Sequence, residues 1–191
     1  CVKVKMPVLV LTNISHGSGQ FVNMSQFSLN LKRIFDLVLA ASGIFFFFPL
    51  GIVFALLVKL EDGGPIFYAQ ERWGKGGKKF RVYKFRTMIP KADEKLGLRP
   101  ARENDIRVTR VGRFLRATAM DELPQLINIW KGDMSFVGPR ALAVEELNPS
   151  SKGFQERHQI RPGLTGPAQV YAPRDTPFEQ KLRYDIGYSQ T

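Results

Sequence analysis

The longest apolar stretch of the chain covers residues 37–58, which read LVLAASGIFFFFPLGIVFALLV and contain no charged side chain. Its 22 residues match the roughly 20 that an α-helix needs to cross the hydrocarbon core of a bilayer. Residues 1–36 precede it and no small-residue cleavage site follows it, so it does not have the layout of a cleaved signal peptide. The pattern therefore predicts a helix in contact with a membrane.

This apolar stretch has a proline in its middle and basic residues at both ends. Pro49 removes a helical hydrogen bond and predicts a kink. Lys32 and Arg33 come before the stretch and Lys59 follows it, and basic flanks normally stay on the cytoplasmic side. A helix that enters the membrane, bends at Pro49 and returns to the same face satisfies both flanks. A kinked helix that spans the bilayer is the alternative, and these residues alone do not decide between the two.

Beyond the apolar stretch, apolar and polar residues alternate on either side of the glycine-rich segment GKGGKK. This pattern predicts a β-hairpin, with one strand around Ile66 and Tyr68, a turn at residues 74–77 and a second strand at residues 80–85. The glycine-rich segment lacks the spacing and the terminal hydroxyl residue of a phosphate-binding loop. Residues 90–105 are polar and are interpreted as a connection.

Helical spacing of apolar residues returns at residues 108–120, which we expect to form a helix. A second helix is expected to begin at Asp121, because Asp is a favoured cap and Pro124 is tolerated in a first turn. Gly132 is the expected end of that helix. Short strands are predicted at SFV and after the loop RPGLTGP. The elements together predict a mixed α/β (α+β) fold.

The charge of the chain is concentrated in one block. Residues 72–116 contain fifteen Lys or Arg and four acidic residues, which accounts for the whole net charge of +11. Such a block attracts phosphate groups, nucleic acid or an acidic membrane face, unless it is only a solvated surface. The single cysteine cannot form an internal disulfide, and with two isolated histidines it gives no zinc-type ligand spacing.

The pair Asp121-Glu122 follows directly after this basic block. A helix cap is the simple explanation, and it is compatible with chemistry because one aspartate can do both. Arginines next to a carboxylate favour phosphoryl transfer, in which a carboxylate attacks phosphorus and Mg²⁺ bound by carboxylate and phosphate oxygens screens the charge. The paired carboxylates of glycoside hydrolases need no such cationic wall.

Four stretches, in this order, closely resemble the bacterial sugar transferases known as monotopic phosphoglycosyl transferases: KRIFDLVLAASG, KFRTM, LRATAMDELPQLINIWKGDMSFVGPR and RPGLTGPAQV. The resemblance covers about residues 30–188. It implies transfer of a sugar 1-phosphate from a UDP-sugar to undecaprenyl phosphate through a covalent aspartyl phosphosugar intermediate, which initiates exopolysaccharide, O-antigen or glycoconjugate assembly. It also implies Mg²⁺ dependence, a re-entrant membrane helix and a place on the cytoplasmic face of the bacterial inner membrane.

Carried over by position, the resemblance makes Asp121 the nucleophile and a ligand of Mg²⁺, and Glu122 its acid–base or metal-side partner. The expected substrate-binding residues are basic: Arg116, Arg140, Lys84, Arg86, Arg161 and Arg174. Arg174 belongs to YAPRD, which replaces an Asn-Gly-Arg-like loop of the family, so the identity of the sugar stays open.

The resulting division of the chain has three parts. Residues 1–30 are a linker or the remnant of a preceding segment, residues 31–60 the re-entrant membrane helix, and residues 61–191 a compact cytoplasmic catalytic domain. The expected partners are a UDP-sugar, undecaprenyl phosphate and a lipid bilayer, with room for a homodimer. The competing hypothesis is a membrane-tethered basic binding or scaffold protein without catalysis. We expect no nucleic-acid partner, because the basic block has few of the interleaved aromatic residues of single-strand binders.

Overall fold

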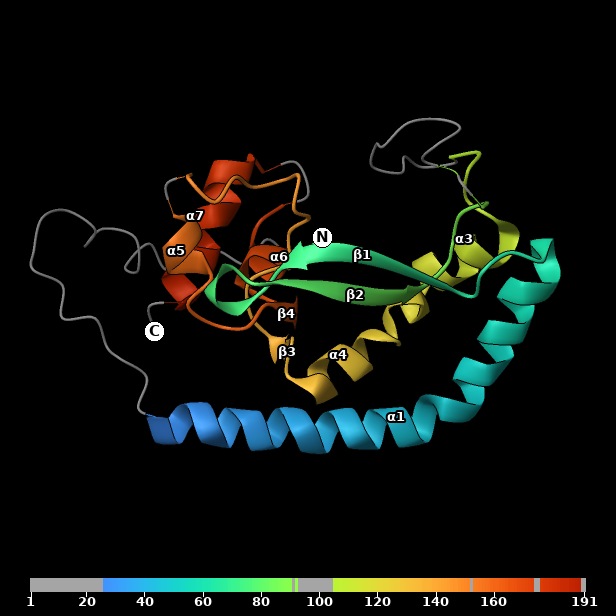
Figure 1. Cartoon of the computed structure of the whole chain (residues 1–191), viewed down its shortest axis with the longest axis horizontal. Coiled ribbons are helices and arrows are strands. Elements are labelled where there is room, and N and C mark those ends of the chain that lie inside the picture. Colours follow the sequence, from blue (N-terminus) through green and yellow to red (C-terminus); the bar gives the residue numbers. More distant parts are fainter. Residues whose placement is uncertain (1–25, 91, 93–104, 152, 174–175, 190–191) are drawn as a thin grey trace, which may run out of the picture.

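One long helix, α1 (Gln26–Asp62), runs along a side of the molecule, and the other elements fold against it (Figure 1). The computed structural model describes residues 26–90, 92, 105–151, 153–173 and 176–189. The elements after α1 are β1 (Phe67–Trp73), the 3₁₀ turn η2 (Lys75–Gly77), β2 (Lys79–Phe85), α3 (Arg110–Ala117), the 3₁₀ turn η3 (Met120–Glu122), α4 (Gln125–Lys131), β3 (Ser135–Val137), α5 (Phe154–Arg157), β4 (Gly163–Thr165), α6 (Pro167–Tyr171) and α7 (Phe178–Ser189). This mixture of helices and strands confirms the expected α/β (α+β) class.

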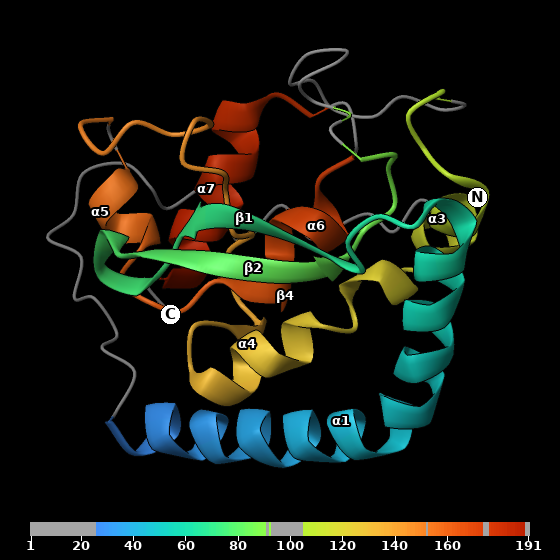
Figure 2. The same cartoon turned by 45° about the vertical axis from the view of Figure 1, so that its right-hand side comes forward.

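Helix α1 bends sharply part-way along, and Figure 2 shows its two arms leaving the bend in different directions. Pro49 lies inside the helix and accounts for the bend, because it lacks an N–H group and its ring clashes with the preceding turn. The first arm (residues 26–48) packs on α4 and β3, and the second arm (residues 50–62) packs on α3 and β2. The helix begins before the boundary that we expected at residue 31.

Each arm of α1 is fixed by its own cluster of buried side chains. Ala40 of the first arm is fully buried against Leu126 and Ile129 of α4. In the second arm, Phe54 and Val58 pack in a separate buried cluster that contains Phe85 and Leu115. Full burial of one such large side chain contributes about 1.5–3 kcal/mol, so both arms are held firmly on the same folded domain.

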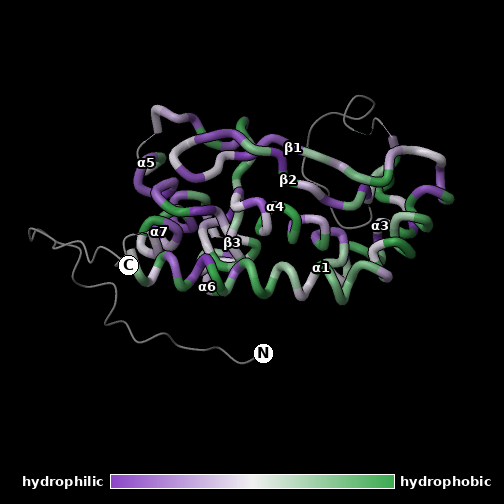
Figure 3. Tube along the Cα trace, turned by 60° about the horizontal axis from the view of Figure 1, so that its bottom comes forward, coloured by the Kyte–Doolittle hydropathy of each residue, from purple (hydrophilic) through white to green (hydrophobic). Residues whose placement is uncertain are grey.

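Many apolar side chains of α1 are exposed. The hydropathy colouring in Figure 3 shows hydrophobic residues along much of this helix. The exposed large hydrophobic side chains of α1 are Phe27, Leu31, Ile34, Phe35, Val38, Leu39, Phe45, Phe46, Phe47, Phe48, Ile52, Val53, Leu56, Leu57 and Leu60. Within the described residues, α1 is the one helix that is long and apolar enough to cross a membrane, judged by length and composition. Only 11% of its most apolar window is buried, whereas the core helix of a soluble protein is mostly buried.

The predicted hairpin is confirmed. Strands β1 and β2 pair antiparallel from Phe67 opposite Phe85 to Trp73 opposite Lys79. The glycine-rich segment forms the turn between them, and Gly76 adopts a φ of 67° that favours glycine. The hairpin crosses the domain, so that its open end lies near α3 and its turn near α5 (Figure 2).

A second, smaller sheet joins β3 and β4 in parallel, with Ser135 opposite Gly163. Strand β3 was predicted correctly. The strand expected after the loop RPGLTGP is wrong: β4 lies within that loop, and the residues after it form α6. Proline is well tolerated in the first turn of a helix, and Pro167 occupies that position in α6.

Candidate active site

Asp121 and Glu122 lie in the 3₁₀ turn η3 between α3 and α4. Ala119, just before this turn, has a left-handed φ of 56°, which is uncommon for a residue with a side chain and breaks the helical path. The prediction that Asp121 caps the next helix is wrong. Helix α4 begins at Gln125, its N-cap position is Pro124, and no side chain caps it. The carboxylate of Asp121 is therefore free of the capping role.

The Asp121 side chain is buried among charged neighbours, with a residue exposure of 9%. Burial raises its pKa above the ordinary value, and the positive charge of Lys84 opposes that rise. The like charge of Glu122 adds to the rise, and Arg116 opposes it. The basic surroundings favour the ionised form of Asp121, but the loss of hydration outweighs them.

Lys84 connects the hairpin to the two carboxylates. It lies in β2, and its ammonium group is 2.5 Å from Oε1 of Glu122. Both side chains are partly exposed, so the pair by itself contributes at most about 1 kcal/mol to stability. Its main effect is positional, because it holds one positive charge beside both Glu122 and Asp121.

Arg116 lies in the last turn of α3, ahead of the Asp-Glu turn. Its Nε donates a hydrogen bond of 2.7 Å to the hydroxyl oxygen of Thr87. This bond orients the guanidinium group and leaves its two terminal amino groups for a ligand, because no described residue accepts a hydrogen bond from them. Thr87 follows the motif residues Lys84 and Arg86 and was not among the predicted site residues. Its place as the hydroxyl residue inside the stretch KFRTM was its only signal in the sequence.

Arg86 has partners elsewhere, although it was predicted to bind substrate. Its guanidinium group donates to both carboxylate oxygens of Asp62 at the end of α1, at 2.6 and 2.5 Å. Its Nε and terminal amino groups also donate to backbone carbonyls of Pro65, Met88 and Val58. All three nitrogens therefore hold the end of the second arm of α1 against the hairpin. A role in substrate binding stays a prediction that would require some of these bonds to break.

Among the described residues, neither Arg140 nor Arg161 forms a hydrogen bond or ion pair with the Asp-Glu turn. Arg140 has an exposed side chain whose charge acts on Arg157 and Asp185, and its backbone carbonyl accepts a hydrogen bond from Arg157. Arg161 lines a pocket at the start of α1. Arg174 lies outside the described residues. The structure thus brings together Asp121 and Glu122 with two of the six predicted basic residues, Lys84 and Arg116.

Comparison with known proteins identifies the chain. Residues 27–191 match the family model described as bacterial sugar transferase. The chain belongs to the bacterial sugar transferase family. This confirms the family that the four sequence stretches indicated, and it places the Asp121 turn inside the region that the family model covers.

Curated relatives in this family cover most of the chain. The exopolysaccharide production protein PSS of Rhizobium leguminosarum bv. phaseoli is 41% identical over 167 residues, which are 81% of this chain and 82% of the relative. A UDP-glucose:undecaprenyl-phosphate glucose-1-phosphate transferase of Caulobacter vibrioides is 45% identical, over 84% of this chain and 62% of the relative. A UDP-N-acetylgalactosamine-undecaprenyl-phosphate N-acetylgalactosaminephosphotransferase of Aeromonas hydrophila is 40% identical, over 83% of this chain and 38% of the relative. The chain thus spans less than two thirds of the latter two proteins.

The family resemblance implies Mg²⁺, and the donor chemistry of the turn was compared with that ion. Among the described residues, no group of three or more His, Cys, Asp or Glu could hold a metal. Asp121 and Glu122 provide two adjacent carboxylates, and Mg²⁺ is commonly bound by one or two carboxylates together with substrate phosphates and water. In this sugar transferase, Asp121 and Glu122 would be the carboxylates that hold a Mg²⁺ ion, with substrate phosphates and water as its other ligands.

A buried ion pair joins α5 to α7 in this sugar transferase, and sequence reasoning missed it. Arg157 of α5 donates to Oδ2 of Asp185 in α7 from Nε at 2.9 Å and from a terminal nitrogen at 2.7 Å. The same guanidinium group donates to the carbonyl of Arg140. Oδ1 of Asp185 is buried without a hydrogen-bond partner among the described residues. No motif or spacing in the sequence connects these residues, because 28 positions separate them.

Proposed function

We propose that this chain transfers a sugar 1-phosphate from a UDP-sugar to undecaprenyl phosphate, the initiating step of exopolysaccharide, O-antigen or glycoconjugate assembly. The observation that carries the proposal is the buried Asp121 carboxylate, which has Lys84 and Arg116 nearby but no ion-pair partner of its own among the described residues. The names of the Caulobacter and Aeromonas relatives each combine a UDP-sugar with undecaprenyl phosphate, and they support the same reaction with two different sugars.

The reaction proceeds in two displacements at one phosphorus atom. In the first, an oxygen of Asp121 forms a bond to the β-phosphorus of the UDP-sugar, and the bond from that phosphorus to the bridging oxygen breaks. UMP leaves with the electron pair, and the sugar phosphate stays on Asp121 as an acyl phosphate. In the second, a phosphate oxygen of undecaprenyl phosphate attacks the same phosphorus and returns the carboxylate of Asp121.

The residues around Asp121 have distinct parts in this proposal. A carboxylate that is already largely desolvated gives up little hydration when it attacks, which fits the burial of Asp121. Arg116 offers its terminal amino groups to phosphate oxygens, since Thr87 holds its Nε. Lys84 neutralises charge between Glu122 and the incoming phosphate. Asp121 and Glu122 would hold Mg²⁺, which supplies positive charge to the diphosphate when it is bound.

We further propose that α1 is re-entrant and that the domain lies on the cytoplasmic face of the bacterial inner membrane. Near the start of α1, Asp36 accepts hydrogen bonds from Ser135 and from the backbone of Phe136. At its end, Asp62 pairs with Arg86. A straight spanning helix would separate these two ends by a bilayer, yet both are bonded to one folded domain. The exposed apolar surface around the Pro49 bend is then the part that enters the lipid.

Cysteine labelling tests this topology. We replace Cys1 by Ser and introduce Asn30→Cys or Glu71→Cys, which are exposed positions on opposite sides of the apolar stretch. A membrane-impermeant thiol reagent should label both variants from the cytoplasmic side, in inverted vesicles. Labelling from opposite sides would establish a spanning helix.

The reaction is tested by measuring UMP release from a panel of UDP-sugars in membranes that contain undecaprenyl phosphate and Mg²⁺. With a substrate from that panel and no lipid acceptor, intact-mass measurement should detect a sugar-phosphate adduct on the wild type and none on Asp121→Asn. Asp133→Asn is the matched control, because it makes the same chemical change at a carboxylate outside the site.

Two outcomes would redirect the proposal. Turnover with lipid but no adduct and no burst of UMP without lipid would indicate direct transfer, with Asp121 as a base or a metal ligand. Binding of UDP-sugars without turnover of any would favour the non-catalytic scaffold hypothesis. A requirement for Mg²⁺ is tested separately, by measuring UDP-sugar binding with and without the ion in wild type and in Asp121→Asn.

A further inference from the structure

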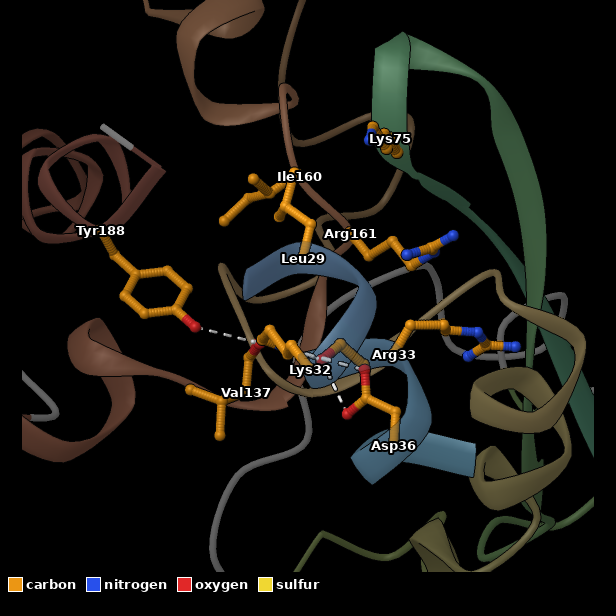
Figure 4. A pocket seen from close by; sticks show the side chains of 10 residues that line it. Leu29, Lys32, Arg33, Asp36, Lys75, Val137, Ile160, Arg161 and Tyr188 are labelled. Atoms are coloured by element: carbon orange, nitrogen blue, oxygen red, sulfur yellow. Dashed lines mark hydrogen bonds and ion pairs between the residues drawn. The ribbon is translucent and has the colours of Figure 1, made fainter. Parts of the chain in front are cut away.

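A second group of cations surrounds a pocket at the start of α1. Figure 4 shows that Lys32 and Arg33 come from α1, Lys75 from the turn of the hairpin, and Arg161 from the segment before β4. Asp36 is the one carboxylate among the described residues that line the pocket. The lining is therefore strongly cationic, and its cations come from three segments that are distant in sequence.

Contacts with the rest of the domain fix some of these cationic groups and leave others available to a ligand. Arg33 donates to two carbonyl oxygens in the last turn of α4 at 2.7 and 2.9 Å, and Nε of Arg161 donates to the carbonyl of Gly132, just after α4, at 2.8 Å. Lys32 lies 3.6 Å from Asp36. Within the described part of the chain, the terminal amino groups of Arg161 and the ammonium group of Lys75 have no such partner. These groups are the donors that a ligand would meet.

The positive charges in the pocket are close enough to repel one another. The charge of Arg161 acts on both Lys32 and Arg33. At Arg33 this repulsion exceeds the attraction of Asp36, whereas at Lys32 the attraction of Asp36 exceeds it. A single phosphate group bound between them would receive charge-assisted hydrogen bonds and relieve this repulsion. The pocket is thus suited to a phosphate monoester or diester.

The position of the pocket selects among phosphate ligands. Exposed apolar side chains of the first arm, including Leu31 and Phe35, lie on the same few turns of α1 as Lys32 and Arg33. The hairpin separates the pocket from the Asp121 turn: its turn carries Lys75, and Lys84 lies near its other end. Seven residues per strand at about 3.3 Å each make that separation roughly 20 Å. A sugar nucleotide bound at Asp121 does not extend so far.

We propose that this pocket binds the phosphodiester headgroup of an anionic phospholipid and thereby sets how deeply the first arm of α1 enters the membrane. The proposal rests on the proposed membrane insertion of α1 and not on the chemistry at Asp121. Anionic lipids are enriched on the cytoplasmic leaflet, where basic residues next to an inserted helix are attracted to them.

The test uses the full chain in micelles of a neutral detergent, which cover α1 and leave the headgroup as the variable. Phosphatidylglycerol should raise the thermal midpoint of the wild type by about 2–4 °C, while phosphatidylcholine should not, because a ligand that binds only the folded state stabilises it. Lys75→Glu should abolish the rise. Lys78→Glu is the matched control, since Lys78 is exposed in the same turn but does not line the pocket.

Each other outcome overturns the proposal. Equal loss of the rise in both variants would mean a general basic surface, and no loss in either would exclude the pocket. Inorganic phosphate that produces the same rise as the lipid would mean a site for free phosphate. UMP release in the same micelles reports the proposed reaction independently, so a failure of that reaction is distinguished from a failure of the lipid site.

Discussion

Asp121 and Asp185 are both buried aspartates whose pKa is raised by burial, yet their surroundings differ in one respect. Asp185 accepts two hydrogen bonds from Arg157 at less than 3 Å. Asp121 has two cations near it, but no described residue forms an ion pair with it. A buried carboxylate with a direct guanidinium partner is committed to the fold. A buried carboxylate such as Asp121, whose neighbouring cations bond to other residues, retains its lone pairs for a ligand.

The sharpest way to break this comparison is Asp121→Asn. An amide cannot act as the nucleophile, so we expect the rate of UMP release to fall by about 10⁴-fold or more. The thermal midpoint should change little, because no ion pair is lost. Kinetics and thermal unfolding of the same preparation measure the rate of UMP release and the thermal midpoint. A well-folded and active Asp121→Asn would remove Asp121 from the reaction.

Asp185→Asn should have the opposite effect. It leaves the buried guanidinium of Arg157 without its counter-charge, which costs about 3–5 kcal/mol and lowers the thermal midpoint on the order of 10 °C. Turnover per folded molecule should fall far less than in Asp121→Asn. The double variant Arg157→Met with Asp185→Leu should recover most of the lost stability. Normal stability with abolished turnover in Asp185→Asn would move Asp185 into the reacting group.

Arg140 lies between the two cases, since its backbone is held by Arg157 while its side chain is exposed. If that side chain binds phosphate with its planar fork, Arg140→Lys should lower kcat/KM by about 10- to 100-fold. Arg183→Lys, at an exposed position of α7, is the control. Wild-type kinetics for Arg140→Lys would assign Arg140 to the structural region alone.

The smallest expected effect is the pH dependence of stability. Because the folded pKa of Asp121 is raised, the folded state binds its proton more tightly than the unfolded state does. The stability from that proton is fully present below the ordinary pKa of 3.8 and is lost as pH rises through the folded pKa. The unfolding free energy of Asp121→Asn relative to wild type should therefore increase with pH across this window. Denaturant unfolding at several pH values measures it, and a constant difference would contradict the raised pKa.

Local patterns predicted much of the fold. The period-two alternation around GKGGKK predicted the hairpin, and Gly132 was expected to end α4, where it adopts a φ of 94°. Those features depend on neighbours in sequence, through backbone hydrogen bonds and the freedom of glycine. The helical start at Asp121 failed for a tertiary reason. The chain turns at Ala119, so that α3 packs on the second arm of α1 and α4 on the first.

The site was predicted in part for the same reason. Composition and motif order were sufficient for the Asp-Glu pair, the basic block and the family. They could not distinguish Lys84, which contacts Glu122, from Arg86 two positions later, which points to Asp62. Residues two positions apart in a strand share a face, so the alternation alone would place both side chains together. Arg86 lies just past the end of β2 at Phe85, where the path of the chain depends on tertiary packing.

The sequence by itself determined the apolar helix, its proline, the excess of positive charge and the carboxylate pair, because each is a property of residue type and spacing. The tertiary structure decided which cations surround Asp121, which bind Asp185 or Asp62, and which line the pocket at the start of α1. Electrostatic interactions and burial depend on distance in space. Arg157 and Asp185 become partners only after α5 and α7 have packed together.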